Sequence, residues 1–184
     1  MYGLHHFFDN ALGGSLHGSS GSGLSEFGIQ VVQELNSRGM IIDVAHSSEN
    51  SVRDVLASIG APLIVSHTGF RGHCDTSRNI SDDLMLELAA RGSLIGVGYW
   101  EEAICDVSPS GIVAALRYGI DLLGVDHIAL GSDYDGTVTT SFAIDELAVL
   151  TQSMIDAGFS EVEIRKVMGG NMLRFLRGNL PVAN

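Results

Sequence analysis

Basic residues are scarce in this sequence. Lys and Arg number 10 against 22 Asp and Glu, so the formal net charge of the 184-residue chain is −12. Proteins that bind nucleic acids or anionic membrane surfaces do so through basic faces that neutralise phosphate groups. The charge balance therefore argues against nucleic acid and anionic lipid as partners.

The sequence also lacks long apolar runs and contains only three prolines and two cysteines. The longest apolar stretches, such as 40–42 and 94–97, are far shorter than the roughly 18 to 20 residues that a membrane-spanning helix needs. Two cysteines exclude a Cys-rich zinc module and leave room for one bridge. Because 45% of the residues are apolar and 17% charged, we expect a packed core in one domain over residues 1–184.

Short apolar runs alternate with stretches of helical periodicity, as in repeated strand–helix units. Because the predicted strands are apolar throughout, both of their faces are buried, which indicates a parallel sheet covered by helices. Two architectures fit this α/β pattern, an open doubly wound sheet and part of a (β/α)8 barrel, and periodicity does not choose between them. Strands are predicted at 2–4, 40–44, 62–65, 93–98 and 127–130, helices at 24–37, 50–59, 81–91, 110–123, 141–157 and 164–176, and a Gly-rich loop at 13–23.

Polar residues follow the strands, at the edge of a parallel sheet where ligands bind. The first strand runs into His5 and His6, the second leads to His46, the third to His67, and the fifth to Asp133. Neutral imidazole is a common zinc ligand, and two histidines at neighbouring strand ends can hold one ion. The alternative, in which each histidine bonds a loop carbonyl, stays open at this point.

Two further side chains in these loops suit a charged substrate. Asp133 can act as a proton acceptor, a ligand or an amine-binding carboxylate, whereas Asp135-Gly136 is typical of a turn. Arg78 can grip a carboxylate with two parallel hydrogen bonds, although a surface salt bridge is the simpler interpretation of an arginine taken alone.

Other motifs are missing or uninformative. His17 and His73 lie in Gly-flanked loop sequence, and we assign them no role. The sequence has no nucleophile elbow, phosphate-binding loop or GxGxxG motif, which argues against a serine hydrolase or a nucleotide-binding protein.

Taken in order, these residues resemble the C-terminal part of the membrane (renal) dipeptidase family, peptidase family M19. The resemblance covers nearly the whole chain and implies a (β/α)8 TIM barrel of the metal-dependent hydrolases, here an incomplete barrel of about five βα units, strands four to eight. The matching stretches are GLHHFFDN, GLSEFGIQVVQELNSRGMIIDVAHSS, PLIVSHTGF, SRNISDD, GVDHIALGSDYDG and IRKVMGGNMLRFL.

The resemblance also implies a zinc-dependent dipeptidase with a two-metal centre. By it, His46 and His67 are ligands of one zinc ion, and His6 polarises the scissile carbonyl and stabilises the oxyanion. Arg78 holds the carboxylate of the dipeptide substrate, and Asp133 handles its amine or a proton. In the family, a hydroxide shared by the two zinc ions attacks the peptide carbonyl.

The chain departs from the family pattern in two places. It lacks the His-x-Asp pair of the first strand and the bridging Glu of the third, and its 184 residues fall short of the about 250 of a typical closed barrel. We therefore expect a fragment that holds zinc weakly and whose open strand edges invite a second copy or a missing N-terminal half. The alternatives are a non-catalytic half-barrel assembly module and another amidohydrolase-like metal hydrolase; Arg78, suited to a free carboxylate, favours the dipeptidase.

Cys74 and Cys105 fall in loops after successive predicted strands. Exported members of the family have a disulfide in this region, so the resemblance favours a Cys74–Cys105 bridge and a periplasmic or secreted location. Two reduced thiols in a cytosolic enzyme are the alternative.

Overall fold

A five-stranded parallel sheet forms the centre of the protein, whose structure, a computed structural model, describes residues 1–181. Each strand pairs with the next in chain order, β1-β2-β3-β4-β5. A doubly wound sheet reverses its strand order at a switch point, whereas a barrel wall does not. The order therefore selects the barrel-type architecture. The strands are β1 (Tyr2–Gly3), β2 (Ile42–Asp43), β3 (Ile64–Thr68), β4 (Leu94–Val97) and β5 (Ile128–Leu130).

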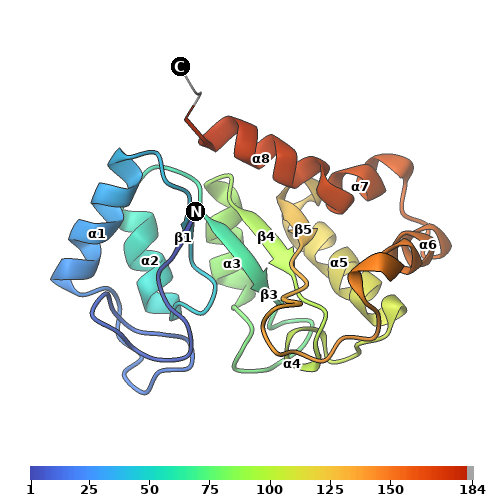
Figure 1. The fold of residues 1–184 in the computed structure, drawn as a ribbon, viewed down its shortest axis with the longest axis horizontal. Helices are drawn as coiled ribbons and strands as arrows, with labels where there is room; N and C mark the ends of the chain where they lie inside the picture. Colours follow the sequence, from blue (N-terminus) through green and yellow to red (C-terminus); the bar gives the residue numbers. More distant parts are fainter. Residues whose placement is uncertain (182–184) are drawn as a thin grey trace.

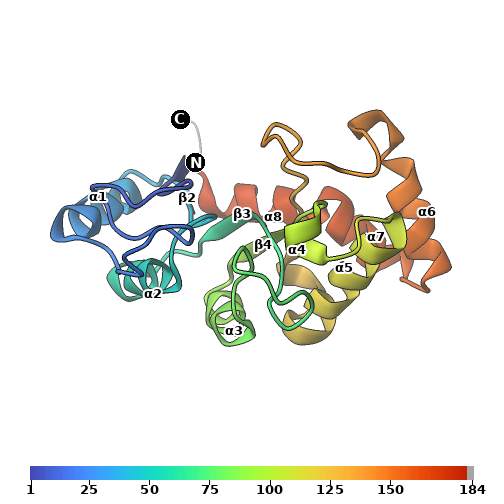
Figure 2. The ribbon, with the colours of Figure 1, turned by 90° about the horizontal axis from the view of Figure 1, so that it is seen from below.

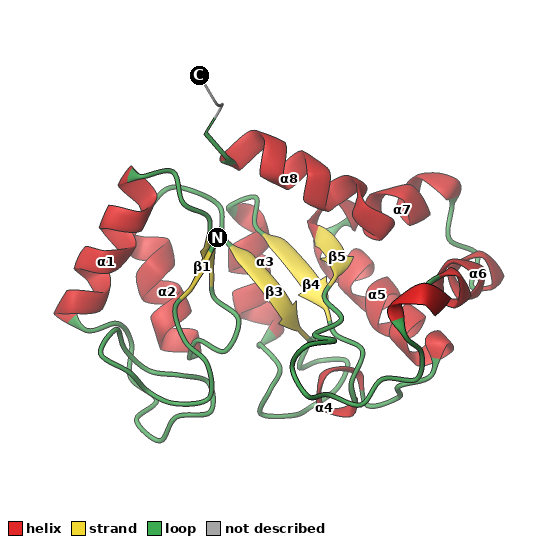
Figure 3. Ribbon diagram, in the orientation of Figure 1, coloured by secondary structure: helices red, strands yellow, loops and turns green. Residues whose placement is uncertain are grey.

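Helices connect the strands and follow the last one (Figures 1 and 3). Most lie near their predicted ranges. The side chains of Ser25 and Ser108 accept hydrogen bonds from backbone amides at the starts of α1 and α5, and Ser160 with Glu163 forms a capping box at the start of α7. The α-helices are α1 (Glu26–Ser37), α2 (Glu49–Ser58), α3 (Asp82–Ala90), α4 (Glu101–Ile104), α5 (Pro109–Leu123), α6 (Ala148–Asp156), α7 (Glu161–Arg165) and α8 (Asn171–Asn179).

The two faces of the sheet are covered differently. Helices α2, α3 and α5 lie on one side of the sheet (Figure 2), where Val65, Ile95 and Ile128 join the main core, whereas α8 packs against the other face. Alternate strand residues, among them Ile64 and Leu94, face Phe175 of α8 in a second, smaller cluster. Side chains of a strand point alternately to opposite faces, so strands that are apolar throughout require cover on both.

Two predicted elements differ from the structure, and one helix of the structure was not predicted. The strand predicted at 62–65 continues to Thr68, so His67 lies inside β3 rather than after it. The helix predicted at 141–157 begins later, after a 3₁₀ turn at Ile144–Glu146, because Phe142 is buried against the ring of Tyr99 at 5.5 Å. The short helix α4 is too brief to produce a periodic pattern and was not predicted.

The predicted helix 164–176 is interrupted by a π-helical segment, Lys166–Gly170. Gly169 has φ 140°, a conformation that residues with a Cβ rarely adopt. Beyond the break, the Asn171 amide donates to the carbonyl oxygens of Val125 and Ile128, which ties the start of α8 to β5. None of the helices described within residues 1–181 is both long and apolar enough to cross a bilayer.

Candidate functional site

A cavity of about 530 Å³ opens at the carboxyl ends of the strands, toward which the strand arrows in Figure 1 point. Four of the five predicted site residues line it, and the fifth, His67 in β3, contacts the cavity residue His46. Loops that follow all five strands thus meet at one place. The lining comprises His6, Phe7, His17, His46, Thr76, Ser77, Arg78, Trp100, Glu101, Glu102, Asp133, Gly136, Thr137, Val138 and Thr139.

His46 and His67 point their Nε2 atoms at each other, 2.9 Å apart. The Nδ1 atom of His67 lies 2.8 Å from the Ser66 hydroxyl, which orients that ring. The carbonyl of His46 accepts hydrogen bonds from the Leu16 amide at 2.7 Å and the Ser15 hydroxyl at 3.1 Å. His46 also has a positive φ of 63°, uncommon for a residue with a side chain and frequent at functional sites.

Both histidines are neutral near pH 7. Burial lowers the pKa of His46 to about 3, helped by the positive charge of Arg78. Burial, followed by Arg78, also lowers the pKa of His67, although the carboxylate of Asp133 acts in the opposite direction. Neutral imidazole is the form that binds a metal ion, so the pair is in the ligand-competent state.

The donor set fits part of a zinc site. Two nitrogens each bound to one tetrahedral zinc at 2.0–2.1 Å would be about 3.3 Å apart, close to the 2.9 Å between the Nε2 atoms of His46 and His67. The nearest carboxylate oxygen, Oδ2 of Asp133, is 3.9 Å from His67 Nε2. Within residues 1–181, no group of three or more His, Cys, Asp or Glu side chains is arranged to hold a metal. The described chain therefore offers two nitrogen donors.

Arg78 lies beneath this pair rather than on the surface, so the surface salt bridge considered from sequence is wrong. The side chain is only 5% exposed, and its Nη2 donates to the carbonyl of His67 at 2.8 Å. The guanidinium lies over the ring of Trp100, 5.4 Å from the ring centroid. Burial lowers its pKa to about 10 against the attraction of Asp133 and Asp43, so Arg78 stays charged at neutral pH.

The GSDYDG segment forms a turn that places Asp133 at the cavity. Asp133 has φ 55°, and its carbonyl accepts from the Gly136 amide at 2.8 Å. A Cβ at Gly136 would lie 2.4 Å from both carboxylate oxygens of Asp133. Gly136 therefore has the structural role expected from its Asp-Gly pair.

The N-terminal segment contributes His6 and His17. The ring centroid of His6 is 4.8 Å from that of His46, and the centroid of His17 is 5.3 Å from it. His5, also predicted at this strand exit, is buried and bonds Ser47 through Nδ1. His17 was given no role from sequence, because its neighbours are loop residues. Only the contacts of its loop with His46 bring it into the site.

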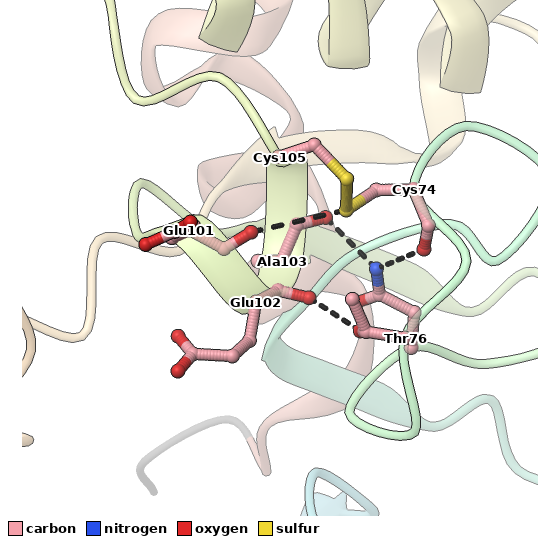
Figure 4. The surroundings of a disulfide bond; sticks show 7 residues. Cys74, Thr76, Glu101, Glu102, Ala103 and Cys105 are labelled. Carbon is pink, nitrogen blue, oxygen red and sulfur yellow. Dashed lines mark hydrogen bonds between the residues drawn. A yellow bond between two sulfur atoms is a disulfide. The ribbon is translucent and has the colours of Figure 1, made fainter.

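Figure 4 shows the disulfide between Cys74 and Cys105, which has the pairing favoured from sequence. It joins the loop carrying Arg78 to the end of α4. Asn79 reinforces the link by donating to the carbonyls of Cys74 at 2.7 Å and Ala103 at 3.0 Å. Two walls of the cavity are thus held together covalently.

The sequence profile of membrane dipeptidase, peptidase family M19, matches residues 1–183. The chain belongs to the membrane dipeptidase family. Dipeptidase 3 from Rattus norvegicus is 31% identical over 180 residues, which are 94% of this chain and 35% of that protein. The chain thus spans about a third of the length of this curated relative.

Solved structures related to this membrane dipeptidase family member share its fold. A metallo peptidase from Rhodobacter sphaeroides, liganded with a phosphinate mimic of the dipeptide L-Ala-D-Ala, has a TM-score of 0.82 at 24% identity, with 90% of this chain and 49% of that chain covered. An amidohydrolase from Burkholderia multivorans with bound zinc has a TM-score of 0.59 at 20% identity, with 85% and 58% covered. These similarities to a metallo peptidase and to an amidohydrolase with bound zinc support the barrel-type α/β fold.

Proposed function

We propose that this chain provides part of the active site of a zinc-dependent dipeptidase, with His46 and His67 as metal ligands. The observation that carries the proposal is the convergence of His46 Nε2 and His67 Nε2, 2.9 Å apart, at a cavity that also holds Arg78 and Asp133. Zinc in a structural neighbour and the dipeptide mimic in another support the choice of metal and substrate.

The charges of the cavity suit a free dipeptide, which carries an ammonium group at one end and a carboxylate at the other. In this proposal the guanidinium of Arg78 binds the substrate carboxylate, because Arg presents planar paired donors. The Asp133 carboxylate, which accepts hydrogen bonds, binds the ammonium group or takes up a proton. Both side chains line the same cavity. A substrate with both ends blocked loses both interactions.

The remaining residues orient and polarise the peptide bond. When bound, zinc supplies a Lewis acid that lowers the pKa of a coordinated water. His6, which lies at the cavity beside His46, donates a hydrogen bond to the carbonyl oxygen as negative charge develops there. Phe7 and Trp100 line the same space and limit access of water to the bond.

The proposal includes ligands from outside this sequence. The described residues supply two nitrogens, and a catalytic zinc usually has three protein ligands. The relatives have additional polypeptide beyond the matched region, since Dipeptidase 3 is matched over 35% of its length. We infer that this chain acts as a fragment of a dipeptidase site, completed by such a segment or by a second copy.

The first test is dipeptide binding and hydrolysis with and without zinc. Trp100 is the sole Trp and lines the cavity, so its fluorescence reports binding directly. We expect Ala-Ala to bind more tightly than its C-terminal amide, and Arg78→Lys to reduce that difference about tenfold. Where zinc-dependent hydrolysis is present, it should be lost in His46→Ala and retained in His73→Ala. Equal binding of Ala-Ala and its amide would contradict the role of Arg78, and hydrolysis that persists in His46→Ala would contradict the metal assignment.

A further inference from the structure

We propose that Glu101 and Glu102 form an acidic wall that makes the cavity selective for dipeptides with a cationic C-terminal side chain. The proposal rests on the dipeptidase function proposed above and adds a substrate class to it. Both glutamates line the cavity, and both are exposed.

The backbone that carries the acidic wall is held firmly. The Cys74–Cys105 disulfide closes one end of α4, and the Thr76 hydroxyl donates to the carbonyl of Glu102. Figure 4 shows both glutamate side chains extending from α4 on the side away from the disulfide. Because their backbone is fixed while their carboxylates are free, a cation entering the cavity meets a pre-positioned negative charge.

The charge of the acidic wall is uncompensated in the protein. Among residues 1–181, no Lys, Arg or His nitrogen lies within 4.0 Å of either carboxylate. Arg78, the cationic side chain of the lining, is buried and already donates to the carbonyl of His67. Besides its histidines, the cavity lining contains three carboxylates, those of Glu101, Glu102 and Asp133, and one guanidinium, that of Arg78. Because neither glutamate carboxylate is paired with a cationic side chain of the described residues, both are available to an incoming cation.

The position of the acidic wall indicates which residue of the dipeptide lies against it. Helix α4 is joined to the loop that carries Arg78, through the disulfide and through Asn79. Arg78 is the proposed partner of the substrate carboxylate, so the residue that lies against α4 is the C-terminal one. Asp133, the proposed partner of the ammonium group, comes instead from the turn after β5.

The test compares Ala-Lys with Ala-norleucine, which has a neutral side chain of similar length. Binding to the zinc-free protein is followed by Trp100 fluorescence, and kcat/KM is measured where zinc-dependent hydrolysis is present. We expect Ala-Lys to be favoured about fivefold at low salt, with less preference at high salt. In Glu101→Gln/Glu102→Gln the ratio of the two affinities, Ala-Lys over Ala-norleucine, should fall to about one.

The double variant Glu34→Gln/Glu161→Gln is the matched control, because it removes the same charge from exposed helix pairs elsewhere. Its preference for Ala-Lys over Ala-norleucine should equal that of the unaltered protein. Binding of both dipeptides without discrimination, or a preference that survives in Glu101→Gln/Glu102→Gln, overturns the inference and leaves the dipeptidase proposal standing. A preference for Lys-Ala over norleucine-Ala instead overturns the assignment to the C-terminal side. Failure of every dipeptide to bind overturns both proposals.

Discussion

At the scale of single residues, the Asp133 carboxylate depends on the absence of a side chain three positions later. A Cβ at Gly136 would lie 2.4 Å from both of its oxygens. We expect Gly136→Ala to displace the carboxylate and lower kcat/KM, or dipeptide affinity, by about 10-fold to 100-fold, since a misplacement of about 1 Å has effects of this size.

The matched control is Gly60→Ala, because a Cβ there meets nothing within 4 Å. Its activity should equal that of the unaltered protein, and thermal unfolding of both variants separates a local effect from a loss of folding. Unchanged dipeptide binding in a folded Gly136→Ala variant would show that the Asp133 carboxylate does not contact the substrate.

The residues of the site were predictable to different extents. His46, Arg78 and Asp133 could be placed together because parallel strands bring their carboxyl ends to one edge. His17 could not, since its loop reaches the site through hydrogen bonds of Ser15 and Leu16 to the His46 carbonyl, which no local pattern encodes. The burial of Arg78 was likewise invisible, because sequence spacing does not report which residues cover a side chain.

At the scale of elements, the start of α7 gives a pH-dependent prediction. The backbone amide of Ser160, then the guanidinium of Arg117, lower the pKa of Glu163 to about 2 from its ordinary 4.5. A carboxylate with a lowered pKa in the folded state contributes stability above about pH 4.5, and this contribution is lost as the pH falls toward 2. We expect Glu163→Gln to reduce the free energy of unfolding by about 1 kcal/mol at pH 7, with the difference shrinking on acidification.

Urea unfolding at pH 7, 5 and about 3 measures this difference. Glu161→Gln is a suitable control, because its pair with Arg165 is highly exposed and contributes at most a few tenths of a kcal/mol. An effect of Glu163→Gln that stays constant between pH 7 and 3 would contradict the assignment of the stabilisation to the ionised carboxylate.

The Cys74–Cys105 disulfide, which links the Arg78 loop to α4, gives a second prediction at this scale, about stability. It closes a loop with a sequence separation of 31 residues, for which loop entropy gives about 3 to 4 kcal/mol of stabilisation. Cys74→Ala/Cys105→Ala should lower the free energy of unfolding by about that much, as measured by urea unfolding without reductant. The denatured, unreduced protein should contain no titratable thiol. Two free thiols would remove the reason to expect a periplasmic or secreted protein, which remains a prediction.

The existence of the strands and of the longer helices could be predicted from periodicity, whereas the residues at which they begin and end depend on tertiary contacts. Buried strands and amphipathic helices have patterns of their own, and the Ser160–Glu163 capping box was readable from its spacing. The break at Gly169 was not, because a helical apolar pattern continues across it. It is the attachment of Asn171 to β5 that fixes where α8 begins.

At the scale of the whole molecule, strand order was the property that the sequence pattern left open. Each strand–helix unit has the same pattern in a doubly wound sheet and in a barrel, because both bury the strands on two faces. The order is set by which neighbouring surfaces pack, here β1 through β5 in succession. Because all five strands are parallel, the loops that follow them lie along one edge of the sheet, where they share one cavity.

The number of donors in that cavity determines how this chain should bind zinc by itself. His46 and His67 supply two nitrogens, and the described residues hold no larger cluster of ligands. Two ligands leave the other positions of a tetrahedral ion to water, so we expect one zinc per chain with a Kd above about 1 μM. Calorimetric titration measures both stoichiometry and affinity, and His46→Ala or His67→Ala should abolish the binding while His73→Ala preserves it. A tight complex with two zinc ions per chain would mean that a second copy, or a rearrangement of Asp133, completes the site, and the proposed need for ligands from outside this sequence would be wrong.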